Sequence, residues 1–231
     1  MKYFGDGLSE LHKELNDIIR KPDKLEEAKR MFLEIHSGLH MSSITGTEEN
    51  EVDNLLNDLA PYEYSIMPTP NDETIAWALW HIARIEDLTM GILVANDEQL
   101  FDGKWKERLN APISDTGNAL SDDEIIELSR RLNMEELIAY RNAVGQRTRM
   151  IVKSLSADDM KRKASPQGIE TIKQAGGVTN QEASLWLLDF WGRKDVAGLL
   201  LMPPTRHVIL HLNDCCKWKQ HIRRGKKCFR R

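Results

Sequence analysis

The feature that most constrains the fold is the segment 74–95, which is apolar on nearly every face when it is placed on a helix. The exceptions are its ionisable side chains, His81, Arg84, Glu86 and Asp87. A helix that is apolar all round must be covered by other elements. We therefore expect this helix at the centre of the molecule, with Asn71 as its N-cap and Glu73 in its first turn.

The remaining apolar residues also recur at helical spacing, and β-strand alternation is nearly absent. This periodicity predicts further helices over residues 8–20, 23–40, 48–59, 121–131, 134–155, 181–201 and 205–224. Ser121 and Glu124 form the sequence pattern of a capping box at the start of one of them. The fold class predicted from this pattern is all-α.

Four segments lack the helical pattern. Residues 61–70 hold three prolines and should form a loop. Residues 96–120 are expected to form a surface flap, and residues 156–180 a polar excursion. Pro203 and Pro204 should interrupt the helical structure before the last helix begins.

Length and composition favour one domain. The chain has 231 residues and a formal net charge of −4, which gives no reason to expect binding to nucleic acid. We expect a single helical-bundle domain over 1–231, with an extra N-terminal helix in 1–22, a core bundle in 23–224 and a basic tail in 225–231. The sequence contains no run of 18 apolar residues, so it predicts no membrane-spanning helix. The three cysteines, Cys215, Cys216 and Cys228, suggest reduced thiols and a cytoplasmic protein.

The histidines carry the most specific chemical pattern. His36 and His40 form one pair at i, i+4, and His207 and His211 form another. This spacing places two imidazoles on one helix face, as a bidentate metal site requires. His81 lies central on an apolar stripe of the 74–95 helix, so it can supply a third ligand. From the pattern alone, a metal site and hydrogen-bonded core histidines remain equal alternatives.

Two short motifs resemble the DinB-like superfamily of damage-inducible four-helix-bundle proteins. They are the run from Trp80 to Asp87 (WHIARIED) and the run from Pro204 to Asn213 (PTRHVILHLN). The resemblance covers about residues 23–224. It implies a four-helix bundle with a divalent ion, Zn, Ni or Fe, held by three histidines that correspond to His81, His207 and His211 here.

The chain departs from the family in two ways. It has extra N-terminal helices and two inserted loop segments, 97–120 and 157–180. The pair His36 and His40 also lies outside the usual triad, and we expect it to line the same pocket. Asp214, one turn after His211, is a candidate for orienting an imidazole or for a fourth ligand.

Other residues near the predicted site have both functional and packing interpretations. Arg84 and Arg206 are candidates for receiving an anionic substrate group, and Trp77 for walling the pocket. Arg84, Glu86 and Asp87 could instead form an ion-pair network between helices. Aromatic residues at helical spacing are usually packing residues, and we expect Trp186 and Trp191 in the core.

Two functions follow from these patterns and from the resemblance. The first is a metal-dependent enzyme, a thiol-dependent S-transferase or a hydrolase, acting on a small molecule with a low-molecular-weight thiol as a candidate partner. The second is a non-catalytic, stress-related helical-bundle protein for binding or dimerisation, whose histidines are structural. The all-round apolar helix would also suit the core of a homodimer.

Overall fold

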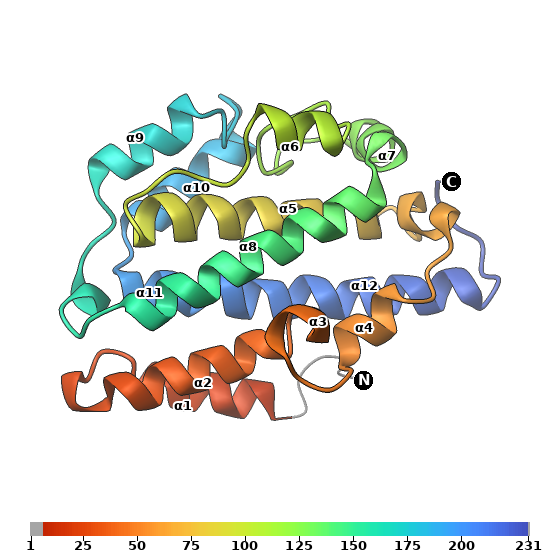
Figure 1. Ribbon diagram of the computed structural model, residues 1–231. Coiled ribbons are helices and arrows are strands. Elements are labelled where there is room, and N and C mark those ends of the chain that lie inside the picture. Colours follow the sequence, from red (N-terminus) through yellow and green to blue (C-terminus); the bar gives the residue numbers. More distant parts are fainter. Residues whose placement is uncertain (1–6, 231) are drawn as a thin grey trace.

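The computed structural model describes residues 7–230 as an all-α bundle, which confirms the predicted fold class. Four long helices form its body: α2 (Leu25–Ser37), α5 (Ile75–Asp87), α8 (Met134–Ser154) and α12 (Val208–Arg223). Helices α5, α8 and α12 run side by side through the middle of the molecule, and α1 (Leu8–Ile18) packs against α2 at one edge (Figure 1).

Helix α5 is the buried centre of the bundle, as its composition predicts. Every residue of α5 is buried, and so is every residue of the π-helix η3 (Leu88–Val94) that continues it. The helix begins after Thr74, whose hydroxyl accepts a hydrogen bond from the Trp77 backbone N–H at 3.0 Å. The expectation that Asn71 is the N-cap is therefore wrong: the Asn71 backbone N–H instead bonds Thr69 in a preceding turn.

The elements between α2 and α5 are short. They are α3 (Ser42–Thr45), α4 (Glu51–Leu56) and the 3₁₀ helix η2 (Pro61–Ser65), and a further 3₁₀ turn, η1 (Pro22–Lys24), precedes α2. Helix α4 is shorter than the predicted 48–59 because Asn50 and Asp53 form a capping box that sets its start. The predicted capping box at Ser121 is confirmed at the start of α7 (Asp122–Arg131).

The two expected excursions contain helices and pack onto the bundle. Residues 96–120 include α6 (Gly103–Arg108), and the segment after it lies on α5 rather than forming a surface flap. Trp80 Nε1 donates to the Asp115 carbonyl at 3.0 Å, and Arg84 Nε donates to the Ser114 carbonyl at 3.0 Å. Residues 156–180 include η4 (Asp159–Lys161) and α9 (Pro166–Gln174).

The predicted helix 181–201 is divided into α10 (Glu182–Gly192) and α11 (Val196–Leu200). The division occurs at Asp195, whose carboxylate caps α11 by accepting from the Gly198 backbone N–H at 2.8 Å. A cap of this kind satisfies an N–H group that would otherwise have no partner at the start of a helix.

The proline pair does not interrupt the helical structure, contrary to the prediction. Pro203 and Pro204 lie in a π-helix, η5 (Met202–His207), which joins α11 to α12. In an α-helix the Leu200 carbonyl would accept from the N–H that Pro204 lacks. The Thr205 hydroxyl donates to this carbonyl instead, at 2.8 Å, so the helical rod continues to His207.

The basic C-terminal region pairs with acidic groups of the same chain. Arg223 Nε and Nη2 bond both carboxylate oxygens of Glu63 at 2.7 and 2.9 Å, and Lys219 pairs with Asp58. Residues 229–230 pair with the backbone at Met67 and Pro68. Across residues 7–230, no helix combines the length and the apolar character that a membrane crossing needs.

Candidate metal centre

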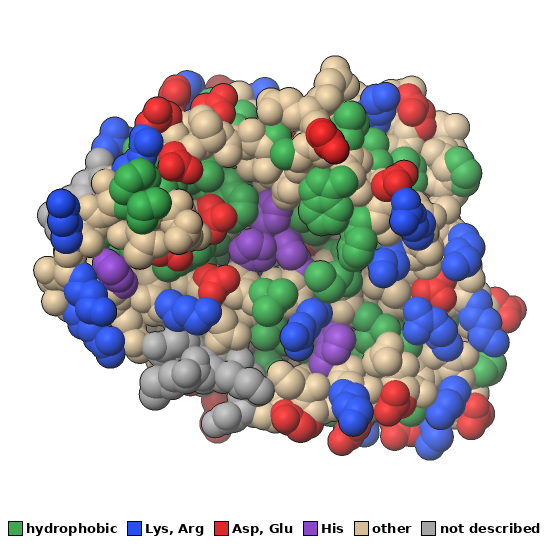
Figure 2. Space-filling model, turned by 180° about the vertical axis from the view of Figure 1, so that it is seen from behind, with side chains coloured by type: hydrophobic (Ala, Val, Ile, Leu, Met, Phe, Trp, Pro, Cys, Tyr) green, Lys and Arg blue, Asp and Glu red, His purple; other side chains and the backbone are tan. Residues whose placement is uncertain are grey.

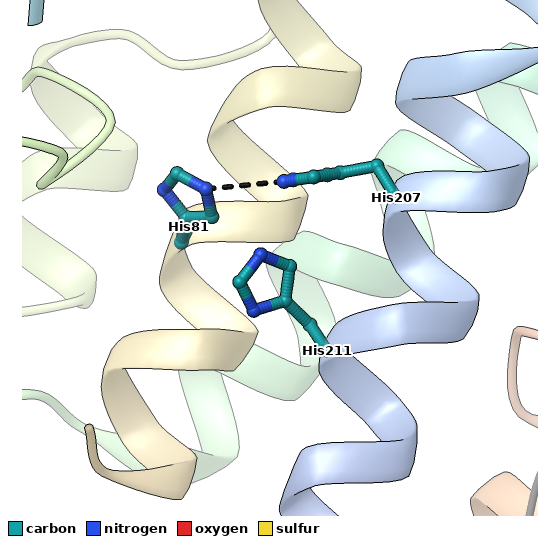
Figure 3. A group of neighbouring side chains, drawn as sticks. All are labelled: His81, His207 and His211. Carbon is teal, nitrogen blue, oxygen red and sulfur yellow. Dashed lines mark hydrogen bonds between the residues drawn. The ribbon is translucent and has the colours of Figure 1, made fainter. Parts of the chain in front are cut away.

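The structure brings His81, His207 and His211 together from separate helical segments. His81 projects from α5, His207 from the end of η5 and His211 from α12 (Figure 3). One ring nitrogen of each lies within 4.8 Å of the corresponding nitrogens of the other two, and His81 Nε2 and His207 Nε2 are 3.1 Å apart. The π-helical turn carries His207 into α12 in the register that places it beside His211.

A backbone carbonyl fixes the orientation of the His81 ring. The Thr116 carbonyl can only accept, so His81 Nδ1–H donates to it at 2.8 Å. The lone pair of His81 is therefore on Nε2, which points at His207. Trp77 stacks on the ring with centroids 4.6 Å apart, and its own Nε1–H donates to the Gly117 carbonyl at 3.0 Å. An imidazole whose far nitrogen donates to a carbonyl is typical of a metal ligand.

Burial keeps all three imidazoles neutral. Desolvation is the main cause, and it lowers the pKa of His81 to about 3 and that of His211 to about 4. Desolvation and the neighbouring imidazoles also hold the pKa of His207 well below its usual value. Neutral imidazoles have the free lone pair that binding of a metal ion requires.

The donor set fits a divalent ion. Metal–nitrogen bonds of about 2.0–2.1 Å in a tetrahedral site place neighbouring ligand nitrogens roughly 3.3 Å apart, close to the separation of His81 Nε2 and His207 Nε2. Three histidines leave one tetrahedral position open, as in catalytic zinc sites. His207 and His211 are only partly buried, and Figure 2 shows histidine side chains in a hollow of the surface that hydrophobic side chains border.

A cavity of about 140 Å³ adjoins the imidazoles of His81 and His207. Its walls are mainly apolar and come from α5, α10 and η5; they include Ile85, Trp186, Phe190 and Met202. Trp186 is 49% exposed, so the expectation that it is a core residue is wrong, whereas Trp191 is buried as predicted. Trp186 and Phe190 are one turn apart on α10, which places both rings on one face.

Trp77 and Asp214 both lie beside the histidines. Besides stacking on His81, Trp77 meets the His211 ring edge-on at 5.7 Å, so it flanks the histidines, although it is not among the residues that line the cavity. Asp214 is near enough to His211 to oppose the lowering of its pKa. Its carboxylate, however, pairs with Lys217 at 2.6 Å, and it does not belong to either group of converging ligand atoms among the described residues.

Arg84 is not placed to bind a substrate. It is fully buried, and its guanidinium donates to Asp87, Tyr140, Gln99 and the Ser114 carbonyl. The interpretation of Arg84 and Asp87 as a packing network therefore holds, and the expectation of a pocket-lining Arg84 is wrong. Arg206 is exposed on η5, and neither arginine is among the residues that line the cavity.

The expectation that His36 and His40 line the same pocket is wrong. Both are fully buried, and they bond Glu86 in a separate cluster between α2 and α5. The reason is that α2 packs against α8 and η5, which turns this pair into the interior of the bundle. The sequence places Glu86 in a predicted ion-pair network between helices, but it does not identify these two histidines as the partners.

The comparisons with known proteins agree with the fold. A family model described as the DinB superfamily matches residues 45–186, which is more than half of the chain. The matched region contains His81 and ends before His207 and His211. No curated protein matches the sequence.

Proposed function

Since this chain belongs to the DinB superfamily, we propose that it is a metal-dependent enzyme for small molecules, with a divalent ion held by His81, His207 and His211. The observation that carries the proposal is the convergence of three neutral imidazoles beside an apolar cavity. A purely structural histidine cluster would not need an adjoining cavity. A bound ion would acidify a water or a thiol at its open position.

The residues around the ion would each have a defined task. The Thr116 carbonyl holds His81 in the tautomer that offers Nε2, and the Trp77 ring packs on the face of the imidazole. The apolar walls exclude water and contact the non-reacting part of the substrate. A cavity of about 150 Å³ lined by apolar side chains can hold benzene, so the 140 Å³ here suits a group the size of one aromatic ring.

We propose thiol-dependent S-transfer or hydrolysis as the reaction. In S-transfer to an epoxide, the thiolate sulfur forms a bond to a ring carbon and the carbon–oxygen bond breaks. The oxygen keeps the electron pair and takes up the proton that the thiol released. The residues that line the cavity include no lysine or arginine, which favours an uncharged, apolar substrate over the anionic one expected from Arg84 and Arg206.

Thiol binding to the cobalt-loaded protein tests this proposal. We expect phenylmethanethiol to change the visible spectrum of bound Co²⁺, and to bind more tightly than the charged 2-mercaptoethanesulfonate. Trp186→Ala should remove this preference while the metal content stays the same, and His207→Ala should abolish the spectral change. If neither thiol altered the spectrum of the loaded protein, the thiol-dependent function would be ruled out and hydrolysis would be tested next with phenyl acetate.

A further inference from the structure

A second cluster of metal-ligand side chains lies in the interior of the bundle, apart from the His81 cluster. His36 is on α2, His40 follows the end of α2, and Glu86 is on α5. All three are buried, with exposures of 0%, 0% and 2%. His36 Nε2 lies 3.1 Å from one oxygen of Glu86, and His40 Nε2 lies 3.3 Å from the other.

The two imidazoles present their lone-pair positions to the same point. Their rings stack with centroids 4.2 Å apart and an interplanar angle of 23°, so both Nε2 atoms face Glu86. The three ligand atoms all lie within 4.8 Å of one another. Separations of 3.1 and 3.3 Å are also those of neighbouring ligands in a tetrahedral site.

Helix α8 leaves space for the His40 ring. A Cβ at Gly145 would lie 2.4 Å from His40 Nδ1, closer than any real contact allows. Glycine in a helix interior is less stable than alanine, and Gly145 lies well inside α8. The backbone is thus adapted to admit an imidazole at this depth, which points to a requirement for the ring in this position.

We propose that His36, His40 and Glu86 form a second divalent-metal site, which ties α2 to α5. Two histidines and one carboxylate are a donor set for Fe²⁺ and also suit Zn²⁺ or Mn²⁺. All three ligands are buried in the interior of the bundle, and none of them lines the cavity beside His81 and His207, so the role proposed for this ion is structural. This proposal is independent of the proposed function.

Hydrogen bonding without a metal is the competing account. In that case both Nε2–H groups would donate to Glu86, and the nearby guanidinium of Arg141 would balance the carboxylate charge. The Nδ1 atoms of both histidines lack a partner in the described residues in either account, so they do not distinguish the two. Two hydrogen bonds offset little of the desolvation of a carboxylate and two rings, whereas a dication binds all three groups at once.

Zinc stoichiometry of the full-length chain separates the two accounts. We expect two equivalents of Zn²⁺ in the wild type and one in the double variant His81→Ala/His207→Ala, measured by elemental analysis after dialysis. Adding Glu86→Gln to this double variant should remove the remaining equivalent. Glutamine keeps the size and a hydrogen-bond acceptor but loses the charge. Zn²⁺ should also raise the melting temperature of the double variant, and Glu86→Gln should abolish that shift.

Gly145→Ala provides a test that leaves all three ligands in place. The added methyl group should displace His40 and weaken binding of the second equivalent at least tenfold, with no change in the equivalent lost by His81→Ala. A double variant that holds no zinc and shows no shift in melting temperature would overturn the proposal. A wild type with one equivalent that depends on Glu86 and not on His81 would support this site and contradict the proposed function.

Discussion

At the scale of single residues, the His81 cluster depends on backbone atoms as much as on side chains. The Thr116 and Gly117 carbonyls accept from His81 and Trp77, and these two bonds set both stacked rings. Gly117 has a φ of +75°, a region that side-chain-bearing residues rarely adopt. The geometry of one imidazole therefore rests on a single glycine in the connection before α7.

We expect Gly117→Ala to weaken metal binding by roughly 10–100-fold, the usual effect of losing a group that orients a ligand. A Cβ there would lie 2.9 Å from Trp77 Nε1, and the left-handed backbone would cost about 1–2 kcal/mol more. Equilibrium titration with Zn²⁺ measures the change. Gly103→Ala is the matched control, because open space surrounds that position. Equal affinities in the two variants would contradict this role of the loop.

At the scale of elements, the rod formed by α11, η5 and α12 places two of the three histidines. Its continuity across Pro203 and Pro204 depends on a side chain that replaces the backbone donor missing at Pro204. The Thr205 hydroxyl covers the Leu200 carbonyl, and His12 Nε2 on α1 bonds the Leu201 carbonyl at 2.8 Å. These contacts link the position of His207 to the packing of α1.

Thr205→Val should destabilise the protein by about 1–3 kcal/mol, because the buried Leu200 carbonyl loses its donor without a change in side-chain size. Urea unfolding measures this loss. Thr171→Val is the control, since Thr171 makes a similar bond on the exposed face of α9, where water can replace the hydroxyl. Comparable losses of stability in both variants would refute the account of the proline turn.

The contact between η2 and the end of α12 predicts a pH dependence of stability. The Arg223 guanidinium lowers the pKa of Glu63 in the folded state. The pair therefore stabilises the fold above the unfolded-state pKa of about 4.3, and this contribution is lost as the pH falls through the lower folded-state pKa.

Glu63→Gln should reduce the free energy of unfolding at pH 7 by about 1–2 kcal/mol, and the difference from wild type should shrink below about pH 4. Urea unfolding at pH 7 and at pH 3.5 provides the comparison. Glu27→Gln serves as the control, because Glu27 pairs with Lys24 on the surface and should have no measurable effect. A Glu63→Gln difference that stayed constant over this pH range would contradict the assignment.

At the scale of the whole molecule, the sequence predicts the elements with strong periodicity and short-range signals. The burial of α5, the helix α8 and the capping box at Ser121 follow from local pattern. The convergence of His81 with His207 and His211 follows from stripes that face one core. The helices of the two inserted segments were not predicted: α6 has only six residues, and α9 follows a polar stretch and packs on η3 and α10.

Long-range pairings could not be predicted from the sequence. The partner of His81 Nδ1 is a carbonyl, which no residue type specifies. The assignment of His36 and His40 to Glu86 depends on the rotation of α2 against α5, and the exposure of Trp186 depends on where α10 ends its contact with the bundle. Pattern fixes which face of a helix is apolar, but it does not fix which neighbour that face meets.

The central claim is that His81, His207 and His211 hold a divalent ion. Elemental analysis of tag-free protein after loading with Zn²⁺ and Ni²⁺ tests it most directly, with His81→Ala compared with His221→Ala. His221 lies on the same helix as His211, but its Nε2 bonds the Lys227 carbonyl far from the cluster. We predict that His81→Ala loses one equivalent of metal and that His221→Ala keeps the wild-type content. A wild type without metal, or a His81→Ala variant with the wild-type content, would contradict the claim.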